Sequence, residues 1–290
     1  MLEMVIDARQ GDLGHGLTVR RVLPYAKRRH VGPFVFLDHA GPVTLAPEHV
    51  RAADVRPHPH IGLSTVSYLL SGQITHRDSL GIRQDIRPGD VNWMTAGRGI
   101  SHSERFTHPA SFAGGGLELM QFWVALPEAD EECEPAFTHY PQALLPERAQ
   151  DGVWLRLFAG SAYGLSSPVR THSPLFALHA RLAPGARLAL PGGHAEQAVY
   201  VAHGGLVHEG VACRPGQLLV FTGEGGDAVT AGDEATTLML FGGTPLGERH
   251  MFWNFVSSRR ERIEQAKADW RAGRFALPPD DHDEWIELPG

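Results

Sequence analysis

The chain has 290 residues, of which 42 % are hydrophobic, and 26 Lys and Arg against 33 Asp and Glu give a formal net charge of −7. This composition is typical of a globular protein with one or two hydrophobic cores, and the acidic balance argues against a surface that binds nucleic-acid phosphates. No apolar run approaches the roughly 20 residues that cross a bilayer, and we expect no signal peptide. Two widely spaced cysteines predict no disulfide framework. We therefore expect a cytoplasmic protein whose partners are neither membranes nor nucleic acids.

Short apolar runs bounded by Gly, Pro, Asp or Asn recur along the chain and predict β-strands. Together with 33 Gly and 21 Pro, they indicate an all-β fold with few helices. The predicted strands are Thr18–Leu23, Val35–Leu37, Thr65–Leu70, Val91–Met94, Met120–Leu126, Val153–Phe158, Phe176–Leu182, Ala198–Val201, Leu218–Thr222 and Thr236–Phe241.

One segment, Ser257–Ala272, has the pattern of an α-helix. It starts with a serine, carries charges throughout, and places Ile263, Ala266 and Trp270 at steps of three and four residues. Such spacing puts the three apolar side chains on one face. We expect a surface helix that packs on a barrel.

An internal repeat divides the chain into two similar halves. Tyr68-Leu-Leu-Ser-Gly72 followed by Arg87-Pro-Gly-Asp90 recurs as Tyr200-Val-Ala-His-Gly204 followed by Arg214-Pro-Gly-Gln217. In both copies a strand ends in a glycine turn, and a Pro-Gly turn leads into another apolar strand. The repeat predicts two β-barrels, over residues 1–140 and 141–290, with the terminal helix in the second part.

Two pairs of potential metal ligands lie in the first half. His58 and His60 form one pair, and His102 and Glu104 form the other. Residues i and i+2 of a strand project from the same face, so each pair can present two donors to one point. Three imidazoles and one carboxylate suit Fe(II), Ni(II), Cu(II) or Zn(II) better than Mg²⁺ or Ca²⁺.

An isolated His-x-His pair is commonly a surface accident, so the second pair and the repeat matter for this prediction. The second pair follows a glycine turn within the same half, as a tightly packed site would require. When the repeats are aligned, the positions that correspond to the four candidates are Leu190, Gly192, Val229 and Ala231. These residues are poor ligands, so we expect metal chemistry in the first half only.

Several motifs resemble those of the pirin family, bicupins of the cupin superfamily. They are Pro57-His-Pro-His-Ile-Gly-Leu63, His76-Arg-Asp-Ser79 and Trp93-Met-Thr-Ala-Gly-Arg-Gly-Ile-Ser-His-Ser-Glu104, with weaker likeness along most of the chain. The resemblance implies two cupin barrels packed face to face. It also implies a mononuclear metal site in the first barrel, with Fe(II) favoured over Ni, Cu, Zn or Mn. The ligands carry over onto His58, His60, His102 and Glu104.

Similarity to bacterial pirins implies quercetin 2,3-dioxygenase activity, in which Glu104 takes the proton of the flavonol 3-hydroxyl before O2 opens the ring. Another planar aromatic enol is an open alternative for the substrate. A further alternative is an iron-binding, redox-sensing or regulatory protein that acts through protein partners. Ser64 departs from the family pattern, in which Glu often occurs in the stretch after the His-x-His pair. Serine is not a strong ligand, so Glu104 is expected to be the carboxylate of the site. We expect residues 107–116 to form a loop over the cleft.

Overall fold

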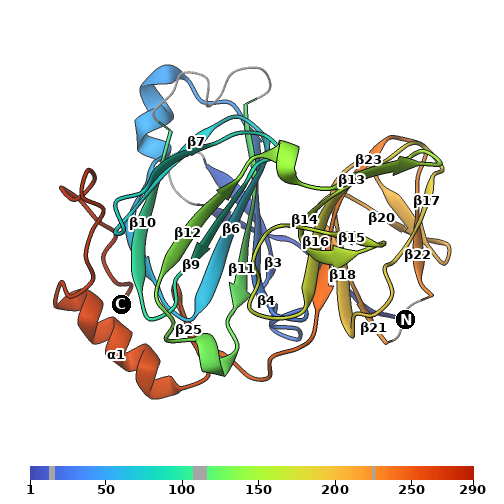
Figure 1. Ribbon diagram of the computed structural model, residues 1–290. Helices are drawn as coiled ribbons and strands as arrows, with labels where there is room; N and C mark the ends of the chain where they lie inside the picture. The colour runs from blue at the N-terminus through green and yellow to red at the C-terminus, as the bar shows by residue number, and fades with distance from the viewer. Residues whose placement is uncertain (13–16, 107–115, 224–225) are drawn as a thin grey trace. The chain divides into compact units, whose positions relative to one another are not determined.

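The computed structural model describes residues 1–12, 17–106, 116–223 and 226–290 (Figure 1). The loop predicted over 107–116 lies outside the described residues, except for Gly116. Two compact units are present. The site unit comprises residues 10–19, 38–142 and 247–290, and the second unit comprises residues 1–9, 20–37 and 143–246. The predicted boundary at residue 140, and the face-to-face packing of two barrels, stay predictions.

Two sheets are built mainly from the first half of the chain (Figure 1). The larger has the order β12-β9-β6-β11-β4-β3-β2, and the smaller has the order β5-β10-β7-β8. Their strands are β2 (Arg9–Asp12), β3 (Thr18–Leu23), β4 (Phe34–Val43), β5 (Val55–His60), β6 (Leu63–Ser71), β7 (Ile74–Asp78), β8 (Arg83–Ile86), β9 (Val91–Thr95), β10 (Ile100–Arg105), β11 (Leu117–Ala125) and β12 (Ala136–Tyr140).

The second half of the chain, together with β1 from the N-terminus, builds an equivalent pair of sheets. The larger follows the order β1-β21-β18-β23-β16-β14-β13 with β15 beside β14, and the smaller follows β17-β22-β19-β20. The strands are β1 (Leu2–Asp7), β13 (Glu147–Gln150), β14 (Val153–Ala162), β15 (Leu165–Ser166), β16 (Leu175–Leu182), β17 (Arg187–Ala189), β18 (Glu196–His203), β19 (Leu206–His208), β20 (Val211–Cys213), β21 (Gln217–Thr222), β22 (Ala228–Ala231) and β23 (Thr236–Gly243).

Both pairs of sheets fit the cupin fold, and all ten predicted strands are confirmed. In the described part of the chain, hydrogen bonds join each pair as separate sheets rather than as one closed barrel. The remaining elements are η1 (Pro47–Ala53), η3 (Glu128–Asp130), η4 (Gln142–Leu144), β24 (His250–Phe252), β25 (Phe255–Ser257) and α1 (Arg260–Arg271).

The predicted helix corresponds to α1, which begins at Arg260 because Ser257 ends strand β25. Its buried residues are Ile263, Ala266 and Trp270, as the spacing predicted. They pack with Phe255 and Ile61 in one apolar cluster of the site unit. No helix in the described ranges is long and apolar enough to cross a membrane.

The internal repeat is confirmed down to single hydrogen bonds. The Gly89 amide donates to the Leu69 carbonyl (2.9 Å), and the Gly216 amide donates to the Val201 carbonyl (2.8 Å). These two hydrogen bonds join each Pro-Gly turn to the strand that opens the repeat, β6 in the first copy and β18 in the second. In both copies the tyrosine that opens the repeat is fully buried. The repeat therefore records two copies of one structural unit.

Candidate metal centre

Strands β5, β10 and β7 lie side by side in the smaller sheet of the site unit and bring the candidate ligands together. His102 lies opposite His58 on β5 and opposite Asp78 on β7. Paired residues of antiparallel strands project from the same face, so these side chains form a row across the sheet. His60 projects from that face as well, because it follows His58 by two residues.

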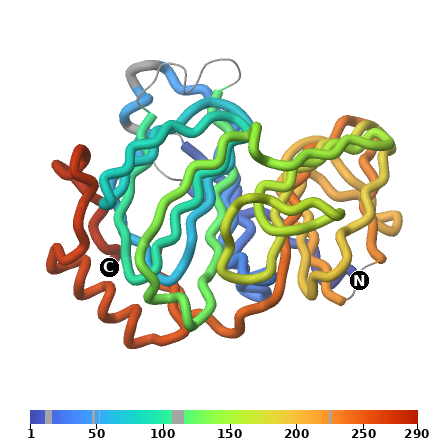
Figure 2. Tube along the Cα trace, in the orientation of Figure 1, coloured from blue at the N-terminus to red at the C-terminus, as the bar shows by residue number. Residues whose placement is uncertain are grey.

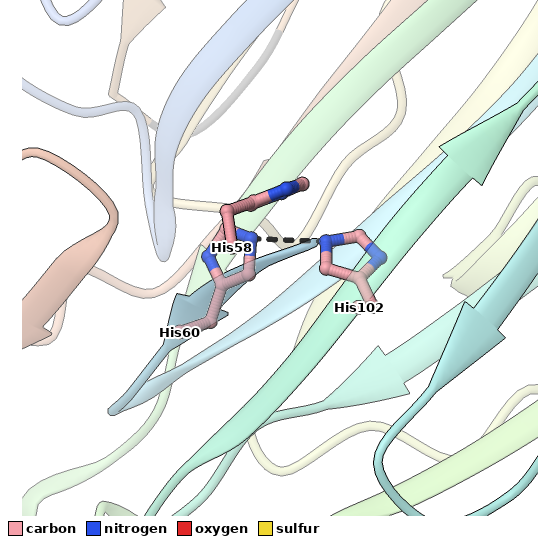
Figure 3. A group of neighbouring side chains, drawn as sticks. All are labelled: His58, His60 and His102. Atoms are coloured by element: carbon pink, nitrogen blue, oxygen red, sulfur yellow. Dashed lines mark hydrogen bonds between the residues drawn. The ribbon is translucent and has the colours of Figure 1, made fainter. Parts of the chain in front are cut away.

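The three imidazoles form a compact buried group (Figure 3). His58, His60 and His102 are 7 %, 1 % and 2 % exposed, and each offers a ring nitrogen within 4.8 Å of the other two. The Nε2 atoms of His60 and His102 are 3.1 Å apart. Two ligands at right angles, each about 2.1 Å from one metal ion, would be ~3.0 Å apart. The observed separation fits adjacent positions in a coordination shell.

Burial keeps these imidazoles in the form that binds metals. It lowers the pKa of His58 to about 4, against a small opposing effect of its hydrogen bond to the Arg56 backbone. Burial and the neighbouring imidazoles also hold the pKa values of His60 and His102 well below the usual value. Neutral imidazole is the ligand form, so little deprotonation has to accompany metal binding at neutral pH.

A backbone contact sets which nitrogen of His58 is free. Its Nδ1–H donates to the Arg56 carbonyl oxygen at 2.9 Å, so the proton resides on Nδ1. The lone pair of Nε2 is then available to a ligand, as in most histidine metal sites. Buried, uncharged and nitrogen-rich, the three donors fit a borderline divalent metal ion.

Glu104, the fourth predicted ligand, is not part of the compact group that the three histidines form. A register shift separates it from His102 in the pairing of β10 with β5, and Glu104 lies opposite Val55 and His76. Among the described residues it belongs to no ligand group whose donors all lie within 4.8 Å of one another. Burial raises the pKa of its carboxyl to about 7. Its role as a ligand stays a prediction.

Ser64 lies on β6 and is buried, with 1 % of its surface exposed. Its hydroxyl is 3.1 Å from the hydroxyl of Thr95 on the neighbouring strand β9. Trp123 of β11 contacts the ring of His60 edge-on, with 5.3 Å between the ring centroids. Trp123 thus forms a wall of the histidine group, whereas Ser64 takes part in a contact within the larger sheet.

Two residues beside the group were missed as site residues. His76 places Nδ1 3.3 Å from Nδ1 of His102, and its Nε2 is 2.9 Å from Oδ2 of Asp78. His76 and Asp78 are 4 % and 0 % exposed. They form a third i, i+2 pair on a strand, which was the available signal in the sequence. What the sequence did not provide was the pairing of β7 with β10.

The equivalent positions in the second unit are apolar, although two of the four aligned residues differ from the prediction. Strand pairing places Leu188 opposite Val229, as His58 lies opposite His102, so Leu188 and Leu190 rather than Leu190 and Gly192 correspond to His58 and His60. These two leucines, Val229 and Ala231 are all buried in that unit's core. A separate group of potential ligands, His208, Glu209 and Asp227, lies in the same unit. The predicted lack of ligands therefore holds only for the equivalent positions.

Comparison with known proteins agrees with this architecture. The chain matches the family model for pirin over residues 16–124 and the model for the pirin C-terminal cupin domain over residues 177–276. It is 51 % identical over 290 residues to a pirin-like protein of Caulobacter vibrioides, covering 100 % of both chains. It is 38 % identical over 271 residues to a Pseudomonas aeruginosa protein named as a candidate quercetin 2,3-dioxygenase, covering 92 % of this chain and 83 % of that one.

A solved structure is similar over nearly the whole chain. The crystal structure of quercetin 2,3-dioxygenase from Acinetobacter baumannii aligns with a TM-score of 0.89 at 32 % identity, covering 99 % of this chain and 95 % of that one. Both family models, the relatives and the duplicated sheets lead to the same assignment, and the chain belongs to the pirin family.

Proposed function

We propose that the protein is a metal-dependent dioxygenase of the pirin type that cleaves quercetin or a related flavonol with O2. The observation that carries this proposal is the buried group of three neutral imidazoles in the site unit. Support comes from the similarity to proteins named as quercetin 2,3-dioxygenases. These imidazoles would hold a divalent ion, Fe(II) by preference, which would supply open positions for a chelating enol and O2.

Each protein ligand has a defined task in this proposal. His58, His60 and His102 would hold the ion through ring nitrogens, and their lowered pKa values keep the three imidazoles neutral at neutral pH. Glu104 would either coordinate the ion as the fourth protein ligand or lie next to the three histidine ligands without coordinating it. Trp123, against His60, excludes water from one side of the group.

Glu104 is the proposed general base. A carboxyl whose pKa is raised to about 7 by burial is divided between its two protonation states near neutral pH. It can therefore accept the proton of a flavonol hydroxyl and later release it, because general bases work best when their pKa is near the working pH. The same carboxylate can act as ligand and as base at different stages.

Flavonol consumption tests the proposal. Protein loaded anaerobically with Fe(II) is mixed with quercetin, and the loss of flavonol absorbance is followed with and without O2. We expect loss only with O2, and none in the His102→Ala variant. His139→Ala, which removes a histidine of the same unit whose ring contacts Asn92, is the matched control and should retain activity. Equal rates in His102→Ala and wild type would contradict the proposed site.

Two alternatives use the same site. If another planar enol is the substrate, quercetin turnover will be slow and a different chelating aromatic will compete with it. If the protein instead regulates partners through its metal, partner affinity should differ between the Fe(II) and Fe(III) forms. Turnover of quercetin that depends on His102 would favour the dioxygenase over the regulator.

A further inference from the structure

His76 and Asp78 lie next to His102, at its Nδ1 atom, whereas its Nε2 atom faces Nε2 of His60. Nδ1 of His76 is 3.3 Å from Nδ1 of His102, and Nε2 of His76 is 2.9 Å from Oδ2 of Asp78. The three side chains therefore form a buried chain of hydrogen bonds from β10 to β7. Neither residue belongs to the three-histidine group itself.

The Asp78 carboxylate determines which atom is the donor and which is the acceptor in each of these hydrogen bonds. The other oxygen of Asp78, Oδ1, accepts the backbone amides of Leu80 (2.9 Å) and Ile82 (3.1 Å), so the carboxylate is held in place as an acceptor. An ionised carboxylate has no proton to donate, and Nε2 of His76 must therefore carry the proton of their bond. Nδ1 of a neutral His76 is then unprotonated and accepts the hydrogen bond that Nδ1–H of His102 donates.

The direction of these hydrogen bonds determines the tautomer of His102, a predicted metal ligand. If Nδ1 of His102 donates to His76, Nε2 of a neutral His102 is unprotonated. That nitrogen is the one that lies 3.1 Å from Nε2 of His60. We infer that His76 and Asp78 are positioning residues that fix the tautomer of His102 and so aim its Nε2 lone pair at the metal ion.

Packing supports a role in orientation. The ring of Phe137 stacks on His76 with 4.3 Å between centroids and 17° between planes. This contact restrains rotation of the His76 ring, and the hydrogen bond to Asp78 fixes the position of its Nε2 atom. Outer partners of this kind orient ligand imidazoles and increase their basicity.

The second unit gives an internal comparison. There Leu206 lies opposite Ala231, in the places that His76 and Glu104 occupy in the site unit. His208 follows Leu206 by two residues, as Asp78 follows His76, so a histidine stands in the position that corresponds to Asp78. The repeat copy that lacks the ligands therefore also lacks this chain of hydrogen bonds.

The inference rests on the proposed metal site, and Asp78→Asn tests it sharply. The Asn side chain keeps the size of Asp and can still accept the two backbone amides through its oxygen. Its NH2 group then faces His76 and donates to Nε2 of that ring, so His76 carries its proton on Nδ1. Nδ1 of His76 then donates to Nδ1 of His102, and the proton of the His102 ring moves to Nε2. His76→Phe is a second variant, which removes the acceptor while retaining an aromatic ring against Phe137.

Two measurements on the full-length protein read out the effect. Zn²⁺ affinity is measured by competition with a chromogenic chelator, and the tautomer of His102 is read from ¹⁵N chemical shifts of the metal-free, histidine-labelled protein. We expect roughly 10–100-fold weaker Zn²⁺ binding in Asp78→Asn and His76→Phe, and a protonated Nε2 on His102 in Asp78→Asn. The matched control is Asp85→Asn, on the neighbouring strand, whose carboxylate accepts from Thr75 and Gln73.

The outcomes separate the two proposals. Asp85→Asn should retain wild-type affinity, and similar thermal unfolding of the metal-free variants will exclude misfolding. Wild-type affinity in both Asp78→Asn and His76→Phe, or a protonated Nε2 on His102 in the metal-free wild type, would overturn the positioning role. Failure of the wild type to bind Zn²⁺, with Nε2 unprotonated, would instead contradict the metal site on which the proposed function depends.

Discussion

His58 and His102 lie directly opposite each other on β5 and β10, and their ring centroids are 4.4 Å apart. Because the two strands are antiparallel neighbours, residues far apart in the sequence meet on one face of the sheet. His60, two residues after His58, completes the group from the same strand. The site is therefore a property of strand pairing, and changes that shift this register will disperse the donors.

The first prediction concerns Glu104 as base. Glu104→Gln keeps the shape of the side chain but removes its ability to accept a proton. We expect turnover of quercetin to fall by about 10²–10⁴-fold, the usual contribution of a general base, while part of the bound metal is retained. Metal content and kcat measured on the same preparation will distinguish these effects. Full activity in this variant would remove Glu104 from the mechanism.

Proton release on metal binding tests whether Glu104 is a ligand. At about pH 6 a carboxyl with a pKa of about 7 is mostly protonated, whereas His58, with a pKa of about 4, is not. Coordination by Glu104 should then release close to one proton. Calorimetry in buffers of different ionisation enthalpy measures this number, and Glu104→Gln should bring it to zero. Absence of release in the wild type would mean that Glu104 does not coordinate the ion.

The same carboxyl should make the stability of the metal-free protein depend on pH. Burial raises the folded-state pKa of Glu104 to about 7, from the usual value of 4.5 for an exposed glutamate. The folded state thus binds more protons between these values, and the free energy of unfolding decreases as pH rises through this range. The loss is at most about 3 kcal/mol above pH ~7.

Urea unfolding of the metal-free protein checks this sign. We expect Glu104→Gln to be close to wild type in stability near pH 5 and more stable near pH 8, where the wild type has to ionise a buried carboxyl. A constant difference between the two proteins at both pH values would show that this carboxyl does not titrate as described.

A C-terminal segment stabilises the outer face of the ligand strand. Figure 2 shows this part of the chain, in red, beside β10. Ser103 and Arg105, which alternate with His102 and Glu104, both donate to the Asp281 carboxylate at 2.5–2.7 Å. Although burial opposes it, these bonds lower the pKa of Asp281. Their stabilisation is therefore present above the usual pKa of Asp and lost in acid.

Asp281→Asn should destabilise the site unit by about 3 kcal/mol, because it leaves the buried Arg105 guanidinium with weaker partners. Asp280→Asn is the matched control, because that side chain is 47 % exposed and its contact with Arg77 is long. It should change stability by less than about 0.5 kcal/mol. Chemical unfolding of both variants measures the difference, and equal stabilities would contradict the role given to Asp281.

Much of the fold was predictable because local signals agree with it. Apolar runs between turn residues located all ten predicted strands, since each run is buried on one or both faces of a sheet. The spacing of Ile263, Ala266 and Trp270 located the buried face of α1. The repeat was visible because its turns need glycine and proline at fixed positions, and both copies retain the same backbone hydrogen bonds.

Features that depend on contacts between distant segments were not predictable. The predicted strands did not include β1, which pairs with β21 at the far end of the sequence. For the same reason, Asp281 gave no sign of its contact with Arg105. His76 and Asp78 belong to a family motif, but the sequence does not identify them as site residues, because their role depends on the pairing of β7 with β10.

The central claim is that His58, His60 and His102 hold one divalent metal ion. The most direct measurement is an anomalous difference map, recorded at the iron absorption edge, from crystals of protein loaded with Fe(II). We predict one peak among the three Nε2 atoms, which disappears in crystals of His102→Ala. A peak elsewhere in the chain, or none among these imidazoles in an iron-loaded wild-type crystal, would contradict the account.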